Sequence, residues 1–224
     1  MRQLFVKTDK SFIAQLPRFT FEGNIVIVQS EKEALRAIEI LSKSDIVGFD
    51  TETRPSFHKG VMHKVALLQI ATHEICFLFR LNMIGLPECI IDFLSNPNIL
   101  KVGLSLKDDW AALKHRQQFT PMNYIDLQNV AAEMGIQDMS LQKLYANIFR
   151  MRISKNARLS NWEADVLTDA QKIYAATDAY TSLQLYDEMI SLKESGLFEW
   201  ASPRPTPEAK VSYELYNIEQ PIQS

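Results

Sequence analysis

Carboxylates are the residues of this chain whose spacing most directly suggests chemistry. Asp50 and Glu52 stand at the end of an otherwise apolar run, VGFDTET. Residues two apart in a strand project from the same face, so the two carboxylates would lie side by side. Two adjacent acids at the end of a buried strand repel each other unless a cation separates them. The alternative is that an acid stands here only because a loop begins.

Two further segments carry acids that could join this pair. Tyr174 and Asp178 are four residues apart, which places them on one face of a helix among small apolar residues. Asp108 and Asp109 fall in the first turn of another predicted helix, where acids are also favoured by the helix dipole. Each segment alone also fits an ordinary helix position. If the sheet brings the three segments together, four carboxylates and a tyrosine converge.

An oxygen-only set of ligands predicts a hard divalent cation. Carboxylates without Cys or His suit Mg²⁺ or Mn²⁺ rather than zinc. Paired Mg²⁺ ions about 3.5–4 Å apart promote in-line displacement at phosphorus. Other site signatures fail, because the chain has neither G-x-G-x-x-G nor G-x-x-x-x-G-K-[ST], and its four histidines form no H-E-x-x-H motif.

The elements that must position these residues follow from hydrophobic periodicity. It predicts strands at 24–30, 45–53, 65–72, 74–81 and 99–105, and helices at 31–44, 87–96, 105–118, 140–149 and 168–195. Ser30 and Thr168 are the expected N-caps. Residues 65–72 and 74–81 are joined by a short turn and should pair antiparallel. Residues 123–126 are predicted to form a turn that leads into a further helical segment. A hairpin followed by strands alternating with helices predicts an α/β fold, a mixed β-sheet flanked by α-helices.

The length of 224 residues suggests one domain with extensions. We predict an N-terminal extension at 1–23 that wraps the domain, the main domain at 24–195, and a Pro-containing C-terminal tail at 196–224. Two cysteines outside any Cys-x-x-Cys pair fit a reducing compartment. Because no apolar run has signal-peptide or membrane-spanning length, we expect a soluble, cytoplasmic protein without a membrane partner.

The net charge of −3 argues at first against a nucleic-acid partner, yet the distribution of charge argues for one. No acid occurs from Met139 to Trp162 or from Thr53 to His73. Basic stretches beside the acidic motifs predict a surface that follows a phosphate backbone; the alternative is ordinary solvated surface. The Lys and Arg residues concerned are Lys143, Arg150, Arg152, Lys155 and Arg158 in the first stretch, and Arg54, Lys59 and Lys64 in the second.

Three motifs carry a specific resemblance. They are VGFDTETRPSF followed by KVALLQIAT, then KVGLSLKDDWAAL, then LSNWEADVLTDAQKIYAATDAY. Together they resemble the DEDD superfamily of 3′–5′ exonucleases in its tyrosine-containing subclass (DEDDy). The chain is most similar to the Werner-syndrome-type exonuclease domain, and ribonuclease D is a relative. The resemblance covers roughly residues 24–192 and implies a ribonuclease-H-like fold.

The resemblance also implies roles for individual residues. Four acids would bind two Mg²⁺ or Mn²⁺ ions: Asp50, Glu52, Asp108 and Asp178. Asp108 is preferred to Asp109 because the family's acid lies two positions before the tryptophan, here Trp110. Tyr174 would contact the attacking water. Its reference pKa near 10 makes it a poor base at neutral pH, so we assign it mainly an orienting role.

The implied substrate-binding residues are Thr51, within the first motif, and Lys155 and Arg158, just before SNW. Thr53 replaces a bulkier residue often seen after the acid pair, which would alter contacts to the terminal nucleotide.

The implied activity is hydrolysis of the terminal phosphodiester, which releases nucleoside 5′-monophosphates. One ion would activate a water and the other would stabilise the departing 3′ oxygen. The expected partner is single-stranded or 3′-ended nucleic acid, with DNA favoured, and no protein partner is deducible. Three alternatives stay open: a ribonuclease D-like exoribonuclease, a catalytically inactive nucleic-acid-binding module, and a hydrolase of small phosphate esters.

Overall fold

The structure is a computed structural model that describes residues 1–58, 60 and 62–201. Its strands are β1 (Arg2–Leu4), β2 (Asn24–Val28), β3 (Ile46–Thr53), β4 (Val65–Ala71), β5 (Ile75–Phe79), β6 (Leu100–Gly103), β7 (Tyr124–Asp126) and β8 (Phe198–Trp200). Its helices are α1 (Lys10–Ala14), α2 (Glu31–Leu41), α3 (Leu81–Ile84), α4 (Glu88–Leu94), α5 (Leu106–Lys114), α6 (Leu127–Glu133), α7 (Leu141–Phe149) and α8 (Asp169–Ser195).

Six strands form one mixed sheet in the order β2-β5-β4-β3-β6-β7. β4 is antiparallel to both of its neighbours, whereas the other pairings are parallel. The predicted hairpin is confirmed, because Ala71 pairs with Cys76 across β4 and β5. The pairing of β3 with β6 ends at Gly48 and Val102. The acidic end of β3 therefore extends beyond the strand that leads into α5.

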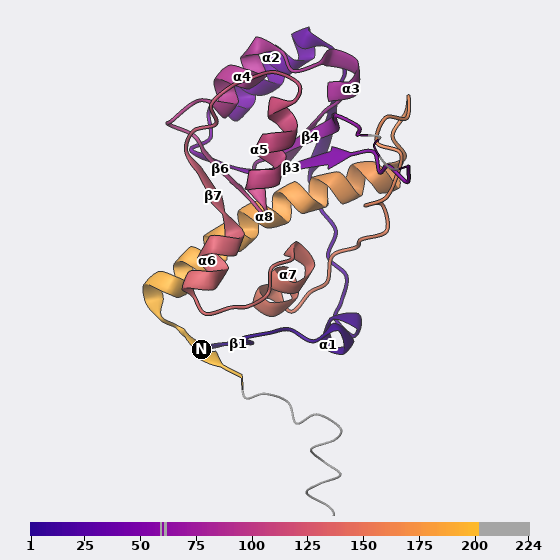
Figure 1. Cartoon of the computed structure of the whole chain (residues 1–224). Coiled ribbons are helices and arrows are strands. Elements are labelled where there is room, and N and C mark those ends of the chain that lie inside the picture. The colour runs from indigo at the N-terminus through magenta and orange to yellow at the C-terminus, as the bar shows by residue number, and fades with distance from the viewer. Residues whose placement is uncertain (59, 61, 202–224) are drawn as a thin grey trace, which may run out of the picture.

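Helices cover both faces of this sheet, which confirms the predicted fold class. On one face, Phe49 of β3 packs against Trp110 of α5 with ring centroids 4.5 Å apart, in a core shared with α2 and α4. On the other face, Ala179 of α8 packs beside the buried Trp162. Leu185 of α8 belongs instead to a core with α6 and α7. Figure 1 shows the resulting layers: α8 runs diagonally between the sheet and these two shorter helices.

The helix α8 is long because its ends are well capped and its middle is buried on several sides. Thr168 and Gln171 form a reciprocal capping box, and Gly196 ends the helix with φ of 64°. The Ser30 side chain likewise accepts a hydrogen bond from Glu33 N at 3.3 Å. Both predicted N-caps are thus confirmed. No helix in the described part of the chain is apolar enough over a sufficient length to cross a membrane.

Gly48 allows β3 and α8 to approach closely. A Cβ at this position would lie 2.0 Å from the backbone oxygen of Ala179, which no side chain could tolerate. Because residues 48, 50 and 52 share one face of the strand, Asp50 and Glu52 also face α8. The missing side chain at Gly48 therefore lets the acid pair of β3 meet Asp178, the residue before Ala179.

The N-terminal segment packs along α7 and the loop after it, rather than lacking structure. Asn147 of α7 donates to Phe5 O at 2.7 Å and accepts from Phe5 N at 2.8 Å. Further along, Arg18 forms a backbone bridge with Arg152. The strand β1 pairs in parallel with β8, as Figure 1 shows near the marked N-terminus. The division into 1–23, 24–195 and 196–224 stays a prediction, and the prolines of the tail lie outside the described residues.

One predicted turn is wrong in part. Residues 124–126 form β7, because Lys101 of β6 pairs with Tyr124 and Gly103 pairs with Asp126. This edge strand places Asp126 beside the start of α5, which matters for the site described below.

Candidate active site

Three carboxylates from two elements lie together at the acidic end of β3. Asp50 and Glu52 project from β3 and Asp178 projects from α8, with one oxygen of each within 4.8 Å of the others. Asp178 and Glu52 are only 8% exposed. The structure therefore brings together three of the four acids that the sequence predicts.

Burial and mutual repulsion make this cluster electrostatically unfavourable without a cation. Burial is the largest cause that raises the pKa of Asp50, followed by repulsion from Asp109 and Glu52. Burial, then repulsion from Asp178 and Asp109, raises the pKa of Glu52 to about 9. Burial raises the pKa of Asp178 to about 7, against the opposing effects of Tyr174 and Lys155. The cluster therefore resists holding its full negative charge at neutral pH.

The fourth acid beside this cluster is Asp109, not the predicted Asp108. Asp109 stands three residues after Leu106 and four before Leu113, two buried residues of α5, so it faces inward. It accepts a hydrogen bond from the Thr51 hydroxyl, and burial raises its pKa to about 6. Asp108 points away from that side of the helix and is exposed. The structure therefore places Asp109, and not the predicted Asp108, next to the other three carboxylates.

Asp126 fixes which of the two acids faces inward. Its carboxylate accepts hydrogen bonds from Ser105 N at 3.1 Å and from Leu106 N at 2.9 Å, at the start of α5. It also caps α6 by accepting from Gln128 N at 2.9 Å. Ser105 adopts the left-handed conformation, with φ of 62°. Asp126 thus sets the rotation of α5, and sequence reasoning missed it because it was placed in a turn.

Tyr174 lies one helical turn before Asp178 on the side of α8 that faces the acids. It is 8% exposed, and its ring centroid lies 6.0 Å from that of Trp162. Burial raises the pKa of its hydroxyl, and the negative charge of Asp178 raises it further. Tyr174 therefore keeps its proton throughout the neutral range. It can hold a hydrogen-bond partner in the cleft and is a poor base at neutral pH.

Comparisons with known proteins agree with this geometry. The profile of a 3′–5′ exonuclease family matches residues 25–192, which include all the acids of the cluster and Tyr174. The chain belongs to the 3′–5′ exonuclease family.

Individual relatives support the same assignment. The chain is 30% identical over 190 residues to the bifunctional 3′–5′ exonuclease/ATP-dependent helicase WRN of Mus musculus, a match that covers 80% of this chain and 14% of that protein. It is 31% identical over 195 residues to a 3′–5′ exonuclease of Arabidopsis thaliana, covering 80% of this chain and 68% of the plant protein. The chain thus spans only a small part of the helicase-containing relative.

Solved structures show the same fold at lower sequence identity. The Nibbler EXO domain of Aedes aegypti superposes with a TM-score of 0.73 at 18% identity, over 81% of this chain and 95% of that chain. RNase D of Escherichia coli superposes with a TM-score of 0.70 at 20% identity, over 87% of this chain and 50% of that chain. These neighbours have the ribonuclease-H-like exonuclease fold, as the sequence predicts.

The cleft that holds the three acids has a volume of about 310 Å³ and is lined by cations as well as acids. Lys155 and Arg158, both predicted to bind substrate, lie in its lining with Asp50, Glu52 and Asp178. The charge of Lys155 lowers the pKa of Asp178, and that of Arg158 lowers the pKa of Glu52. The two cations therefore lie close enough to the acid cluster to act on its charge.

Other residues of the basic stretches have structural partners. The Arg150 guanidinium lies 4.6 Å from the ring centroid of Phe5 and donates to Asn147 O. The Arg152 Nε donates to Leu16 O at 3.0 Å. Lys143 pairs with the buried Asp138 at 3.3 Å. The absence of acids in residues 139–162 thus does not mean that every cation there faces solvent. Lys59 lies outside the described residues.

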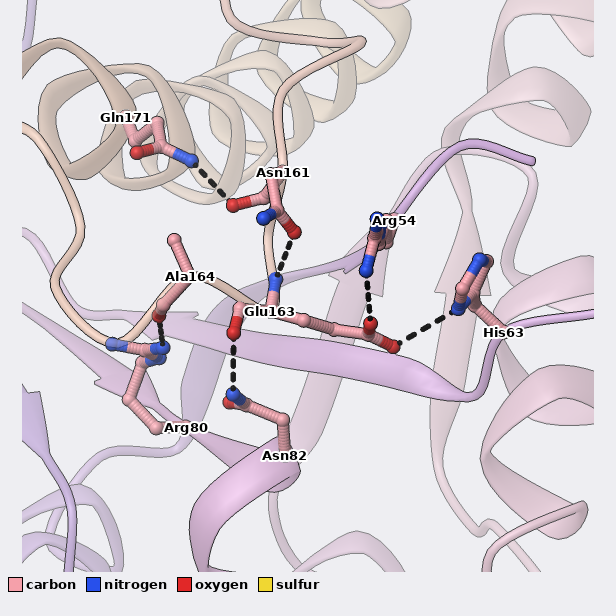
Figure 2. A network of polar contacts seen from close by, with 8 residues as sticks. All are labelled: Arg54, His63, Arg80, Asn82, Asn161, Glu163, Ala164 and Gln171. Carbon is pink, nitrogen blue, oxygen red and sulfur yellow. Dashed lines mark hydrogen bonds and ion pairs between the residues drawn. The ribbon is translucent and has the colours of Figure 1, made fainter. Parts of the chain in front are cut away.

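The loop that carries Arg158 is anchored to the sheet by a polar network, shown in Figure 2. Glu163 forms an ion pair with Arg54 at 3.2 Å, and its other carboxylate oxygen lies 3.2 Å from Nδ1 of His63. Its backbone oxygen accepts from Asn82 at 3.4 Å, and the buried Arg80 donates to Ala164 O. Glu163, the first acid after the acid-free residues 139–162, therefore connects the end of β3 to the loop. This network holds one wall of the cleft in place.

A second hollow of about 830 Å³ adjoins the cleft. Tyr174 and Ser154 line both spaces. Residues 18–20 of the N-terminal segment form part of the wall of this hollow, opposite Asn161 and Gln171. The surface beside the acids therefore includes residues that precede the matched family domain.

Proposed function

We propose that this chain removes nucleotides from the 3′ end of nucleic acid by hydrolysing the terminal phosphodiester with two divalent cations, Mg²⁺ or Mn²⁺. The product would be a nucleoside 5′-monophosphate. The observation that carries the proposal is the group of three close carboxylates, Asp50, Glu52 and Asp178, which line one cleft together with Lys155 and Arg158.

The donor set fits hard divalent cations. It offers only carboxylate oxygens, two of the three acids are almost fully buried, and their repulsion would be relieved by positive charge. When bound, such ions lower the pKa of a water and stabilise the departing oxygen in displacements at phosphorus. We assign Asp109 as the fourth acid, because Thr51 holds its carboxylate beside Asp50. Thr51 then positions Asp109 rather than contacting substrate.

Tyr174 would orient the attacking water. Its hydroxyl stays protonated, lies in the cleft lining and interacts with Asp178. A fixed hydroxyl can direct a lone pair of water toward phosphorus without accepting a proton. Lys155 and Arg158 would bind the oxygens of the terminal phosphates, which places the bond to be cleaved over the acids.

We favour DNA as the substrate, with a ribonuclease D-like exoribonuclease activity as the alternative. The preference rests on the resemblance of the three motifs to the Werner-syndrome-type exonuclease domain, which the 30% identity to the WRN protein supports. A cleft that recognises phosphates does not by itself discriminate between the two sugars.

Matched DNA and RNA strands with a labelled 3′ end test this proposal. We expect nucleoside 5′-monophosphate to appear from the 3′ end in the presence of Mg²⁺ or Mn²⁺, faster from DNA than from RNA. Single strands, recessed ends and overhangs compared in parallel give the preferred end. Faster release from RNA would favour the exoribonuclease. Binding without release of nucleotide would identify an inactive binding module, and hydrolysis of free nucleotide alone would identify a small-ester hydrolase.

A further inference from the structure

A second basic pocket lies next to the cleft, at the contact between α1 and α7. It has a volume of about 300 Å³, and four cations line it: Lys10, Lys143, Arg152 and Lys155. No acidic residue is part of this lining. Lys143 is paired with Asp138, but that carboxylate is buried and also accepts from Thr8 N, so it neutralises only part of the charge. The pocket therefore has a net positive charge.

The pocket adjoins the cleft that holds the acids. Lys155 and Gln142 line both spaces. Burial lowers the pKa of Lys155, and the charges of Arg158, Lys10 and Lys143 lower it further. The cations of the two spaces are therefore close enough to repel one another. A polyanion that runs from the cleft into the pocket would relieve this repulsion.

The N-terminal segment holds Lys10 at this position through contacts on both sides of α1. Before the helix, Thr8 N donates to Asp138 at 2.8 Å, and Asn147 binds the backbone of Phe5 twice. After the helix, Arg152 donates to Leu16 O at 3.0 Å. Lys10 itself is exposed. Lys10 precedes the residues that the family profile matches, which begin at 25.

We propose that this pocket, formed by Lys10 with Lys143, Arg152 and Lys155, binds a backbone phosphate of the nucleic-acid strand whose 3′ end occupies the cleft. The proposal rests on the proposed function, since it assumes that the strand enters beside Lys155. Its consequence is that the N-terminal segment takes part in holding long substrates. A strand too short to reach the pocket would gain nothing from it.

Lys10→Ala tests the proposal, and Lys7→Ala is the matched control because Lys7 is an exposed cation of the same segment outside the pocket lining. Binding of a fluorescent single strand of about ten nucleotides is measured against salt concentration in the Asp178→Asn background, where no digestion is expected. One phosphate contact on a single strand contributes about 0.7 to the slope of log K against log salt, so its loss weakens binding about fivefold near 0.1 M salt.

We expect Lys10→Ala to lower the salt slope by about 0.7 and to weaken binding about fivefold. Lys10→Arg should bind as the parent does, and Lys7→Ala should change neither the slope nor the affinity. Cleavage of a dinucleotide, measured in the chain with Asp178 intact, should be unaffected by Lys10→Ala. Equal binding by Lys10→Ala and its parent, or equal losses in the Lys7 and Lys10 variants, would overturn the proposal. If the parent chain digests DNA but Lys10→Ala binds the strand as tightly as its parent, only the proposed phosphate pocket is refuted. A parent that binds strongly but never digests would refute only the proposed function.

Discussion

Replacing Asp178 with Asn should stabilise the metal-free protein, because it removes one charge from a cluster that the fold forces together. Asp178 has a pKa of about 7 in the fold against an ordinary value of 3.8. Keeping it ionised costs about 1.4 kcal/mol for each unit of that difference, or about 4 kcal/mol at pH 8. Asn has nearly the same size and can still bond to Tyr174, so we expect a gain of about 2–4 kcal/mol.

The pH dependence of the parent protein has a definite sign. These acids have higher pKa values in the folded than in the unfolded state, so their contribution favours folding below about pH 4. That contribution is lost as pH rises through 6 and 7 to about 9, the values for Asp109, Asp178 and Glu52. In EDTA the parent should therefore lose stability from pH 5 to pH 9, and Asp178→Asn should lose less.

Thermal unfolding in EDTA and in Mg²⁺ measures these effects. For a chain of this length about 2–4 kcal/mol corresponds to a Tm increase on the order of 4–16 °C for Asp178→Asn at pH 8. Mg²⁺ should raise the Tm of the parent more than that of the variant, since a ligand stabilises only the state that binds it. A variant that is less stable than the parent in EDTA, with equal Mg²⁺ responses, would refute the electrostatic reasoning.

Three further changes test other parts of the site. Asp109→Asn should lower kcat at least about 100-fold, whereas Asp108→Asn should change kcat by no more than about twofold, because only Asp109 is held beside the cluster. Initial rates on a 3′-labelled strand compare the two variants. A larger loss in Asp108→Asn than in Asp109→Asn would restore the assignment to Asp108. Tyr174→Phe should lower kcat about 10- to 100-fold with little change in KM. Single-turnover rates check this, and an unchanged rate would show that the Tyr174 hydroxyl does not orient the water. Gly48→Ala should destabilise the fold by about 3 kcal/mol or more, because its Cβ would meet Ala179 O at 2.0 Å, and a denaturant midpoint like that of the parent would contradict the close approach.

Most of the sheet could be predicted from the sequence because its strands are apolar and β-branched. The hairpin of β4 and β5, the long α8 and its Thr168 cap all follow from local patterns. The short elements β1, α1, α3, β7 and β8 could not be predicted in this way. Each has only three to five residues, too few for a period to show, and the strands β1, β7 and β8 form by pairing with segments distant in the sequence.

The acids were predictable as a set, but their fourth member was not. Residues two apart on a strand or four apart on a helix share a face, so spacing pairs Asp50 with Glu52 and Tyr174 with Asp178. Only the family resemblance predicted that the two pairs meet. The choice between Asp108 and Asp109 depends on how α5 is rotated, which Asp126 sets from a distant strand. One signal was present: Leu106, Trp110 and Leu113 mark the buried side of α5, and only Asp109 lies within that side.

The roles of the basic residues needed the structure most. Five cations within residues 139–162 look alike in the sequence, yet two line the cleft and three hold the N-terminal segment or a buried acid. Charge patterns locate a basic region, whereas the contacts of each guanidinium or amine decide its use.

Release of nucleotide from a 3′-labelled DNA strand by the parent chain, Asp50→Ala and Asp178→Ala tests the central claim most directly. The account predicts that the parent releases labelled nucleoside 5′-monophosphate only when Mg²⁺ or Mn²⁺ is present, and that both variants release none above background. Full release by either variant, or equal release by the parent in EDTA, would contradict hydrolysis by cations held between β3 and α8.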